Sequence, residues 1–158
     1  MSRRVLSAVA LAALFIFATT LTAFAEMSRP VIAAFKGQLV ISNGELPVGK
    51  NDKDTIAKIK KAQLKELKGE TSDDVTAWHF SYTAFVTKTG SKTLKMEFLK
   101  NGKLAADQKL DGFDAKSAVL SGDISINEDE GLAKGNTYQI QLLTPSGAVV
   151  AKTTLVMK

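Results

Sequence analysis

The sequence contains no cysteine, only three prolines, one histidine and one tryptophan among its 158 residues. Without cysteine the fold has no disulfide, and thiolate nucleophiles and cysteine metal sites are excluded. The single imidazole argues against a histidine-based zinc site, because no second imidazole or thiolate is present to complete it. The fold must therefore be held by burial of apolar side chains, which a chain of this length can supply.

Long apolar runs are also missing, except for one at the N-terminus. Arg3 and Arg4 precede an apolar stretch over residues 5–18, and Ala23-Phe24-Ala25 stands directly before Glu26. This pattern predicts a cleaved signal peptide over residues 1–25 and one mature domain over residues 26–158, secreted or periplasmic. An uncleaved membrane anchor is the alternative. After cleavage we expect no integral membrane span, and the lack of cysteine excludes lipid attachment through a modified cysteine at the cleavage site.

Positive charge is present but modest. Once Arg3 and Arg4 are removed, 19 basic and 16 acidic side chains leave a net charge of +3. This is too small to indicate a nucleic-acid partner. Two segments carry the basic excess, with seven lysines against three acids in residues 50–68 and six against two in residues 88–109.

The stretch Trp78 to Val86 holds the only Trp, the only His and three of the ten Phe and Tyr residues. Its residues alternate with period two, which predicts a central strand covered on one face. The predicted inward set is Trp78, Phe80, Tyr82, Ala84 and Val86, and the predicted outward set is His79, Ser81, Thr83, Phe85 and Thr87. Of the aromatic residues, only Phe85, Phe113 and Phe35 are left outside the expected core.

Other segments follow the same pattern or a helical one. A helix is expected over about 55–67, capped by Asp52 or Asp54 and stopped at Gly69. Residues 26–36 have no clear period, and 70–74 is interpreted as a polar linker. Further strands are expected over residues 37–42, 92–99, 117–126 and 137–143, followed by a final hairpin through Thr144-Pro145-Ser146-Gly147 that ends the chain.

Two hairpins allow their pairing to be predicted. Around Asn101-Gly102 we favour a three-residue loop that pairs Phe98 with Leu104 and Lys95 with Asp107, since a two-residue loop would place Asp107 on the apolar face. In the last hairpin, closing between Leu143 and Ala148 pairs Leu142 with Val149 and Ile140 with Ala151.

About seven strands with one polar face each, together with one helix, predict an all-β, mainly antiparallel fold. We expect a single β-sandwich of immunoglobulin-like size. The alternative is a closed up-and-down β-barrel, whose inward residues would surround a ligand cavity. The size of the inward side chains favours a filled core, as judged from Trp78, Phe80, Tyr82, Met96, Phe98 and Tyr138.

Residues that carry chemistry are sparse. A Ser-His-Asp triad would have to use His79 with Ser81, and the sequence has no G-x-S-x-G motif. Asp107, Asp111 and Asp114 frame a turn, where such residues form local hydrogen bonds. The acidic loop 127–131 offers oxygen ligands without the spacing of a dedicated calcium loop. We therefore predict no catalytic residue, no metal and no cofactor.

The sequence thus indicates a non-catalytic binding module of unidentified ligand. The alternatives are a small barrel that carries an apolar ligand, and a carboxylate-based hydrolase. An envelope polymer, an anionic surface or another protein is the expected partner. If the helix packs over the hairpin end, the two basic segments form one surface for an anionic partner, represented by Lys58, Lys60, Lys61, Lys65, Lys95 and Lys103.

Overall fold

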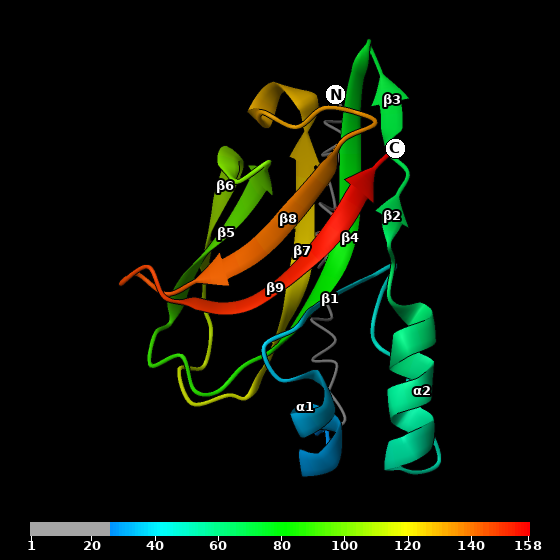
Figure 1. Cartoon of the computed structure of the whole chain (residues 1–158), viewed down its shortest axis with the longest axis vertical. Coiled ribbons are helices and arrows are strands. Elements are labelled where there is room, and N and C mark those ends of the chain that lie inside the picture. Colours follow the sequence, from blue (N-terminus) through cyan, green and yellow to red (C-terminus); the bar gives the residue numbers. More distant parts are fainter. Residues whose placement is uncertain (1–25) are drawn as a thin grey trace, which may run out of the picture.

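The computed structural model describes residues 26–158, which form two β-sheets packed face to face (Figure 1). The four-stranded sheet contains β1 (Leu39–Ser42), β3 (Glu70–Ser72), β4 (Val75–Phe85) and β7 (Val119–Asn127). The five-stranded sheet has the order β2 (Glu66–Leu67), β9 (Val149–Met157), β8 (Thr137–Leu143), β5 (Thr93–Lys100) and β6 (Lys103–Asp111). The predicted β-sandwich is confirmed, and the closed barrel is wrong. The predicted signal peptide lies outside the described residues.

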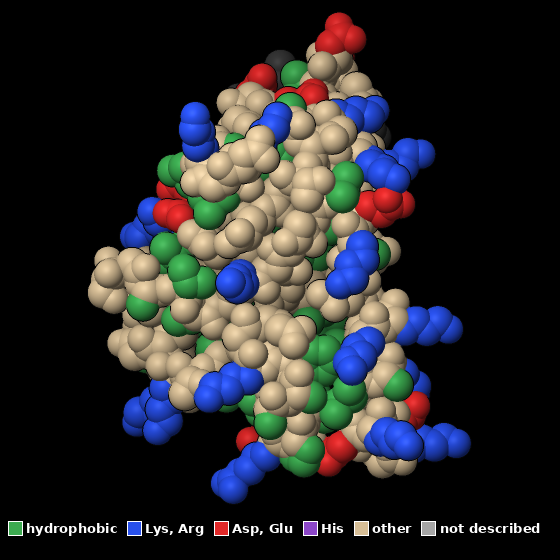
Figure 2. Space-filling model, viewed as in Figure 1, with side chains coloured by type: hydrophobic (Ala, Val, Ile, Leu, Met, Phe, Trp, Pro, Cys, Tyr) green, Lys and Arg blue, Asp and Glu red, His purple; other side chains and the backbone are tan. Residues whose placement is uncertain are grey.

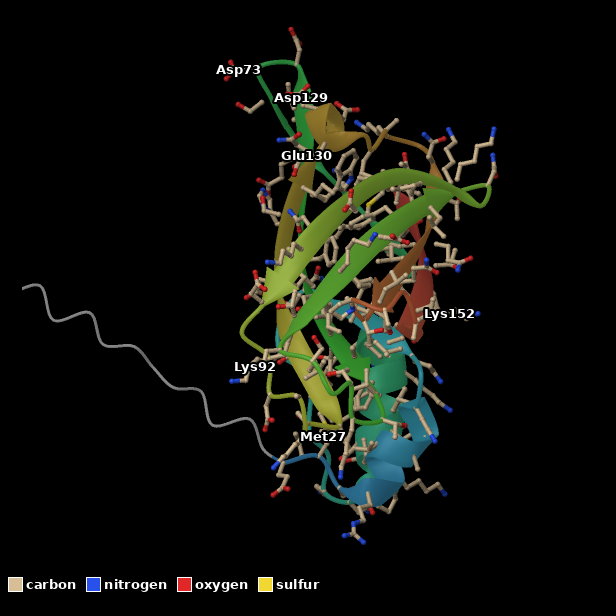
Figure 3. All side chains as sticks on the ribbon, turned by 90° about the vertical axis from the view of Figure 1, so that its left-hand side faces the viewer. Met27, Asp73, Lys92, Asp129, Glu130 and Lys152 are labelled. Atoms are coloured by element: carbon tan, nitrogen blue, oxygen red, sulfur yellow. The ribbon has the colours of Figure 1, made fainter. Side chains whose placement is uncertain are left out.

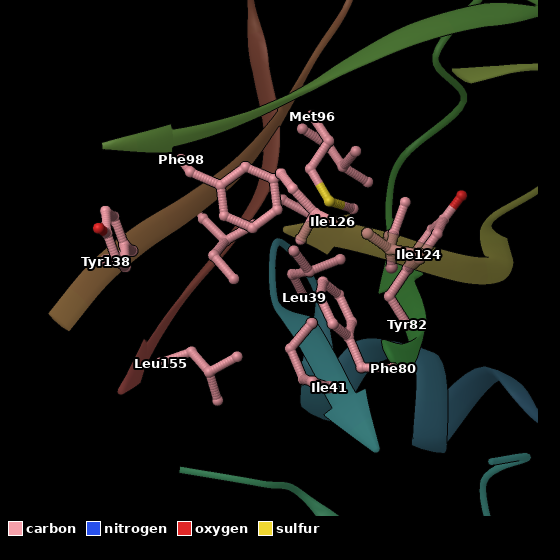
Figure 4. Packing of buried hydrophobic residues seen from close by; sticks show 14 of the residues in the cluster. Leu39, Ile41, Phe80, Tyr82, Met96, Phe98, Ile124, Ile126, Tyr138 and Leu155 are labelled. Carbon is pink, nitrogen blue, oxygen red and sulfur yellow. The ribbon is translucent and has the colours of Figure 1, made fainter. Parts of the chain in front are cut away.

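The space between the sheets is filled by the side chains that the alternation placed inward. Trp78, Phe80, Tyr82, Ala84 and Val86 are all 4% exposed or less. Figure 4 shows the aromatic and aliphatic side chains of the two sheets meeting in this layer, where the rings of Phe80 and Phe98 pack edge to face with centroids 6.5 Å apart. The inward face of β4 was therefore predicted correctly, and the core between the sheets is packed.

A short helix that the sequence did not predict begins the described chain. α1 (Arg29–Phe35) has Pro30 in its first turn, where a missing N–H costs nothing. Only Val31 and Phe35 of this helix are buried, one turn apart. Two apolar anchors are too few to produce a recognisable period, which is why the sequence pattern did not reveal it.

The second helix lies earlier in the chain than predicted. α2 (Asp52–Ala62) is capped by Asn51, whose side chain accepts a hydrogen bond from the amide of Asp54, so the predicted Asp caps are wrong. After Ala62 the chain becomes extended: Leu64 donates its N–H to Ile41, and β2 pairs parallel with β9. Pairing with strands therefore ends the helix well before Gly69.

The two helices cover part of the outer face of the four-stranded sheet. Side chains of the helices and of the sheet form a second apolar cluster, made of Val31, Phe35, Val40, Leu46, Ile59 and Phe85. Phe85 is fully buried, and its ring lies 5.1 Å from that of Phe35. The prediction that Phe35 and Phe85 lie outside the core is wrong, because helices cover this part of the outer face. Phe113 is partly buried against the main core.

The predicted polar linker before β4 is a strand. β3 pairs antiparallel with the start of β4, and Asp73 and Asp74 form the turn with positive φ angles of 50° and 67°. Two consecutive left-handed residues are typical of tight hairpin turns, and Asp tolerates this conformation. The described part of the chain thus has nine strands in place of the predicted seven or so.

The predicted pairing of β5 with β6 is wrong. Asn101 and Gly102 form a two-residue turn with φ angles of 51° and 76°, and Lys100 pairs with Lys103. The bulge falls later, between the Leu99–Leu104 and Phe98–Ala106 pairs, so that Lys95 lies opposite Lys109 and Glu97 opposite Asp107. At the bulge the carbonyl of Ala105 approaches Gly131, where a Cβ atom would lie only 2.1 Å from it.

The last hairpin exists as predicted, but its pairing is shifted. Gly147 donates to the carbonyl of Thr144, which closes the expected turn, and Leu143 pairs with Val149. A bulge then changes the register, so that Leu142 pairs with Ala151 and Ile140 with Thr153. From Ala151 onward the shift of two residues keeps each side chain on its predicted face, so the inward pattern could not detect it. Val149, predicted opposite the inward Leu142, instead lies before the bulge and is 49% exposed.

Candidate binding groove

The outer face of the four-stranded sheet is only half covered. The helices lie at one end of the molecule, and the strands continue beyond them (Figure 1). Where the cover ends, a cavity of about 720 Å³ opens between the segment leading into α1, the loop before α2 and the beginning of β7. Figure 3 shows Met27, which lines this cavity, close to one end of the sandwich.

The cavity has an apolar part and a polar part. Its apolar lining comes from three segments far apart in the sequence and includes Met27, Ile32, Leu46, Val48 and Val119. Its polar lining includes the hydroxyl groups of Thr83 on β4 and Ser121 on β7, which lie directly opposite each other in the sheet. An apolar pocket with a few polar groups is the usual form of a ligand site.

A shallower depression of about 400 Å³ continues along the same sheet face. It is lined by His79 and Ser81 of β4 and by Asp123 and Ser125 of β7. The register pairs Ser81 with Asp123, directly after the Thr83–Ser121 pair on the same face. We call the cavity and this depression together the outer groove.

The outer groove carries mainly negative charge. Four carboxylates line it, from Glu26, Glu45, Asp114 and Asp123, against the single ammonium of Lys116. The amide of Lys116 donates to the carboxylate of Asp114 at 2.9 Å, which holds this loop in a turn. Residues 26–158 as a whole carry a net charge of +3, so this local concentration of acids favours a cationic ligand.

The structure brings His79, Ser81 and Asp123 into one depression, but not as a triad. The hydroxyl of Ser81 donates directly to Asp123 at 2.6 Å, and within residues 26–158 no hydrogen bond joins His79 to either of them. In a triad the histidine stands between the carboxylate and the serine and accepts the serine proton. Here the carboxylate of Asp123 accepts the hydrogen bond of the serine hydroxyl directly, so Ser81 and Asp123 form a cross-strand hydrogen-bonded pair and not part of a triad.

Tyr82 supports the groove from beneath. It faces the core opposite Gly122, where a Cβ atom would lie 2.8 Å from the tyrosine hydroxyl oxygen. Burial, together with the nearby Asp123 carboxylate, raises the pKa of Tyr82 to about 12. A side chain at position 122 would therefore collide with Tyr82. With glycine there, the tyrosine ring packs over the backbone of β7.

The carboxylates proposed for hydrolysis do not converge. Asp107 and Asp111 lie four residues apart on one face of β6, about 13 Å along a strand, which exceeds the separation used by glycosidases. The hydroxyl of Thr93, which donates to Asp111 at 2.7 Å, and the ammonium of Lys109 hold the pKa of Asp111 below its usual value. Asp114 belongs to the outer groove instead.

The acidic loop 127–131 uses its carboxylates to cap the backbone. It forms a 3₁₀ turn (Glu128–Glu130), in which Glu130 accepts the amide of Asn127 at 2.9 Å. Glu128 accepts the amide of Thr76 at 2.9 Å, and this hydrogen bond lowers its pKa. Figure 3 shows Asp129 and Glu130 at one end of the molecule beside Asp73. Among residues 26–158, no three His, Asp or Glu side chains are grouped to hold a metal ion.

The six lysines predicted to mark one basic surface fall into two groups. Lys58, Lys60 and Lys61 lie on α2 and Lys65 follows it, whereas Lys95 lies on β5 and Lys103 begins β6. α2 and the β5–β6 turn are at opposite ends of the molecule, so the helix does not pack over the hairpin (Figure 1). Figure 2 shows basic side chains along the edge formed by α2 and β2, separated by acidic ones.

Two of these lysines are engaged locally. Lys58 pairs with Asp54 at 3.2 Å, and Lys95 pairs with Glu97, whose carboxylate raises the pKa of Lys95. In the described part of the chain, no ion pair involves Lys60, Lys61 or Lys65. The side chains of these three lysines are exposed and can meet solvent or a partner.

The sequence did not identify the outer groove, although its polar residues were visible. In residues 78–86 and 117–126, hydroxyl and carboxylate side chains stand at alternate positions. From the sequence alone this pattern predicts only that one face of each strand is exposed to solvent. The missing information was that these two strands are neighbours, which follows from antiparallel pairing over nine residues. Glu26, Leu46 and Asp114 come from loops that carry no motif.

Comparisons with known proteins add little. The chain matches no protein-family model and no curated protein. Among solved structures, a β-glucosidase from Kluyveromyces marxianus is similar over 59% of this chain, with 13% identity and a TM-score of 0.31. The match spans only 14% of that enzyme, and such a low score supports no conclusion about function. Across residues 26–158, no helix has the length and apolar character needed to cross a bilayer.

Proposed function

We propose that this protein is an exported, non-catalytic β-sandwich module that binds its partner in the outer groove. The observation that carries the proposal is the 720 Å³ cavity, which joins an apolar pocket to a row of hydroxyl and carboxylate groups on a rigid sheet. Export rests on the N-terminal pattern of Arg3 and Arg4, the apolar run and Ala23-Phe24-Ala25.

Two features favour binding over the other functions considered. The inward side chains pack against each other between the sheets, which leaves the groove as the place for a ligand rather than the interior. In the groove, the hydroxyl of Ser81 donates to the carboxylate of Asp123 and not to the imidazole of His79, so the histidine that a triad requires is not in place. A binding module needs only the shape and charge that the groove provides.

Ligand screening by NMR on ¹⁵N-labelled residues 26–158 tests this proposal. The panel should contain mono- and disaccharides, short peptides and small apolar acids and amines. We expect at least one class to shift the amide signals of Thr83, Val119 and Ser121 without being converted during the experiment. Thr83→Trp and Ser121→Trp should abolish these shifts, and Thr154→Trp on the exposed surface of β9 is the matched control.

Shifts confined to the five-stranded sheet would contradict the proposal, as would conversion of a bound compound. A panel in which no class moves the groove signals would also contradict it.

A second candidate is electrostatic binding of an anionic surface along α2, favoured by the unpaired Lys60, Lys61 and Lys65. Changing these three residues to Glu is expected to abolish retention on anionic vesicles at low salt. Such binding weakens as salt screens it, the Debye length being about 8 Å at physiological ionic strength. Retention is measured by co-sedimentation at low and high salt.

The control variant, Lys92, Lys100 and Lys103 to Glu, makes the same change in net charge within the other basic segment, residues 88–109. If both variants lose retention equally, only net charge matters. Absence of retention by the parent protein would leave these lysines a solubility feature.

A further inference from the structure

The strand β7 forms a free edge of the four-stranded sheet beside the outer groove. It pairs with β4 through nine consecutive residue pairs, with no change of register, and in the described part of the chain no other strand pairs with it. In Figure 1 this edge of β7 points away from β4 towards the left-hand side, which is the side that Figure 3 shows. A regular strand with one unpaired side is a template for another strand.

The backbone groups that face outward can be assigned. The amide of Val86 donates to the carbonyl of Ala118, its direct partner in the β4–β7 register, so this pair is of the hydrogen-bonded type. Pairs alternate in an antiparallel ladder, so Leu120, Gly122, Ile124 and Ile126 bond to β4. The N–H and C=O groups of Ser121, Asp123 and Ser125 therefore face away from the sheet.

Both ends of this edge are already satisfied by side chains. Ser117 hydrogen-bonds through its hydroxyl to both the amide and the carbonyl of Val119, and Glu130 accepts the amide of Asn127. Gln108 of β6 donates its side-chain amide to the carbonyl of Ser125 at 3.1 Å. Over residues 26–158, no hydrogen bond is formed by the N–H and C=O of Ser121 and Asp123 or by the N–H of Ser125.

The other long edge is protected, and this one is not. β6 contains a bulge and the charged residues Lys103 and Lys109, devices that prevent strand addition. β7 has no lysine, no proline and no bulge, and its one charged side chain, Asp123, is tied to Ser81. β7 therefore offers an unprotected edge directly beside the groove. We call its outward-facing residues Ser121, Asp123 and Ser125 the open section.

We propose that this open section of β7 receives an extended, cationic segment of a partner protein as an added strand. The proposal deepens the proposed function, on which it rests, by naming the ligand class of the outer groove. Alternate side chains of such a strand lie on the outer sheet face, beside Asp123 and towards the groove acids Glu45 and Asp114. Backbone hydrogen bonds supply affinity, and the charge of the groove selects for lysine or arginine.

A second copy of this chain fits the edge less well. An antiparallel β7–β7 pair centred on the open section would place two Asp123 carboxylates directly opposite each other, and like charges at that position are destabilising. The negative lining of the groove thus favours a basic segment over the strand's own copy.

Synthetic peptides test the proposal on unmodified protein. The probe is acetyl-Thr-Lys-Val-Lys-Val-Lys-Thr-amide, compared with a version that has Glu for Lys and with two N-methylated versions, methylated at the Lys or at the Val residues. Each methylated peptide keeps the charge but loses the hydrogen-bond donors along one edge. We expect the basic peptide to bind, the Glu peptide not to bind, and one of the two methylated peptides to lose binding.

Two measurements locate the contact. On binding, hydrogen exchange of the amides of Ser121, Asp123 and Ser125 should slow, while that of other exposed amides stays unchanged. Asp123→Asn, which keeps a hydrogen-bond acceptor for Ser81, should weaken binding of the basic peptide about two- to fivefold, the range of an exposed ion pair. Asp107→Asn on β6 is the matched control and should leave affinity unchanged.

Equal binding of both methylated peptides would show attraction by charge alone and would overturn strand addition. Failure of the basic peptide to bind at low salt would overturn it as well, while groove shifts caused by another ligand class would still support the proposed function. Concentration-dependent dimerisation that protects the same three amides would make a second copy the occupant and would also overturn it.

Discussion

Replacing Trp78 by alanine is expected to lower the free energy of unfolding by about 3–5 kcal/mol, the usual cost of removing a large buried aromatic side chain. Trp78 is fully buried, and its indole N–H donates to the backbone carbonyl of Lys158 at 3.3 Å. Gly69 makes room for the indole, since a Cβ atom there would lie 2.8 Å from the ring nitrogen. The substitution removes core volume and the link to the C-terminal residue together.

Urea unfolding followed by circular dichroism measures the effect. His79→Ala, one residue along β4 on the exposed side, is the control and should stay within about 0.5 kcal/mol of the parent protein. Where Trp78→Ala does not fold, Trp78→Phe provides a graded loss. A parent tryptophan fluorescence maximum at the position of free indole in water would show that the faces of β4 are reversed.

Phe85→Ala is expected to cost a similar amount, about 3–5 kcal/mol, although Phe85 lies on the opposite face of the same strand. It is fully buried beneath the helices, beside Phe35 and close to Val40 and Ile59. Removing the ring leaves a cavity between the sheet and its helical cover. The helices should therefore also become more sensitive to proteolysis, because their apolar contacts are few.

Phe113→Ala is the matched comparison, since Phe113 is an aromatic residue that is only partly buried. It should be clearly less destabilising than Phe85→Ala under the same urea titration. If Phe85→Ala instead stays within about 0.5 kcal/mol of the parent, Phe85 faces solvent and the second apolar cluster does not exist.

The contrast between Trp78 and Phe85 explains how far the sequence could predict the fold. Period-two alternation is a local property, so Trp78 was placed in the core from its neighbours alone. The opposite face of β4 carries His79 and Phe85, and the alternation cannot say which part of that face is covered. The cover comes from α2 and from α1, which lies more than forty residues earlier in the chain and packs through two anchors that form no visible period.

The candidate site shows the same division. Ser81 and Asp123 were each assigned to a polar strand face, but their hydrogen bond depends on β4 and β7 being neighbours. The two basic segments were visible as clusters in the sequence, and only the structure showed that α2 and the β5–β6 turn lie at opposite ends (Figure 1).

The amino-acid sequence by itself determined that the fold is all-β, that disulfides are absent and which side chains of β4, β5, β7 and β8 face the core. These properties follow from composition and from the two-residue repeat of an extended chain. The tertiary structure alone decided the strand register, the helical cover over Phe85 and the acidic groove beside the open edge of β7. Each of these depends on contacts between segments distant in the sequence. The bulge before Ala106 even reverses one predicted face, because Leu104, expected opposite the inward Phe98, pairs with Leu99 and is 55% exposed.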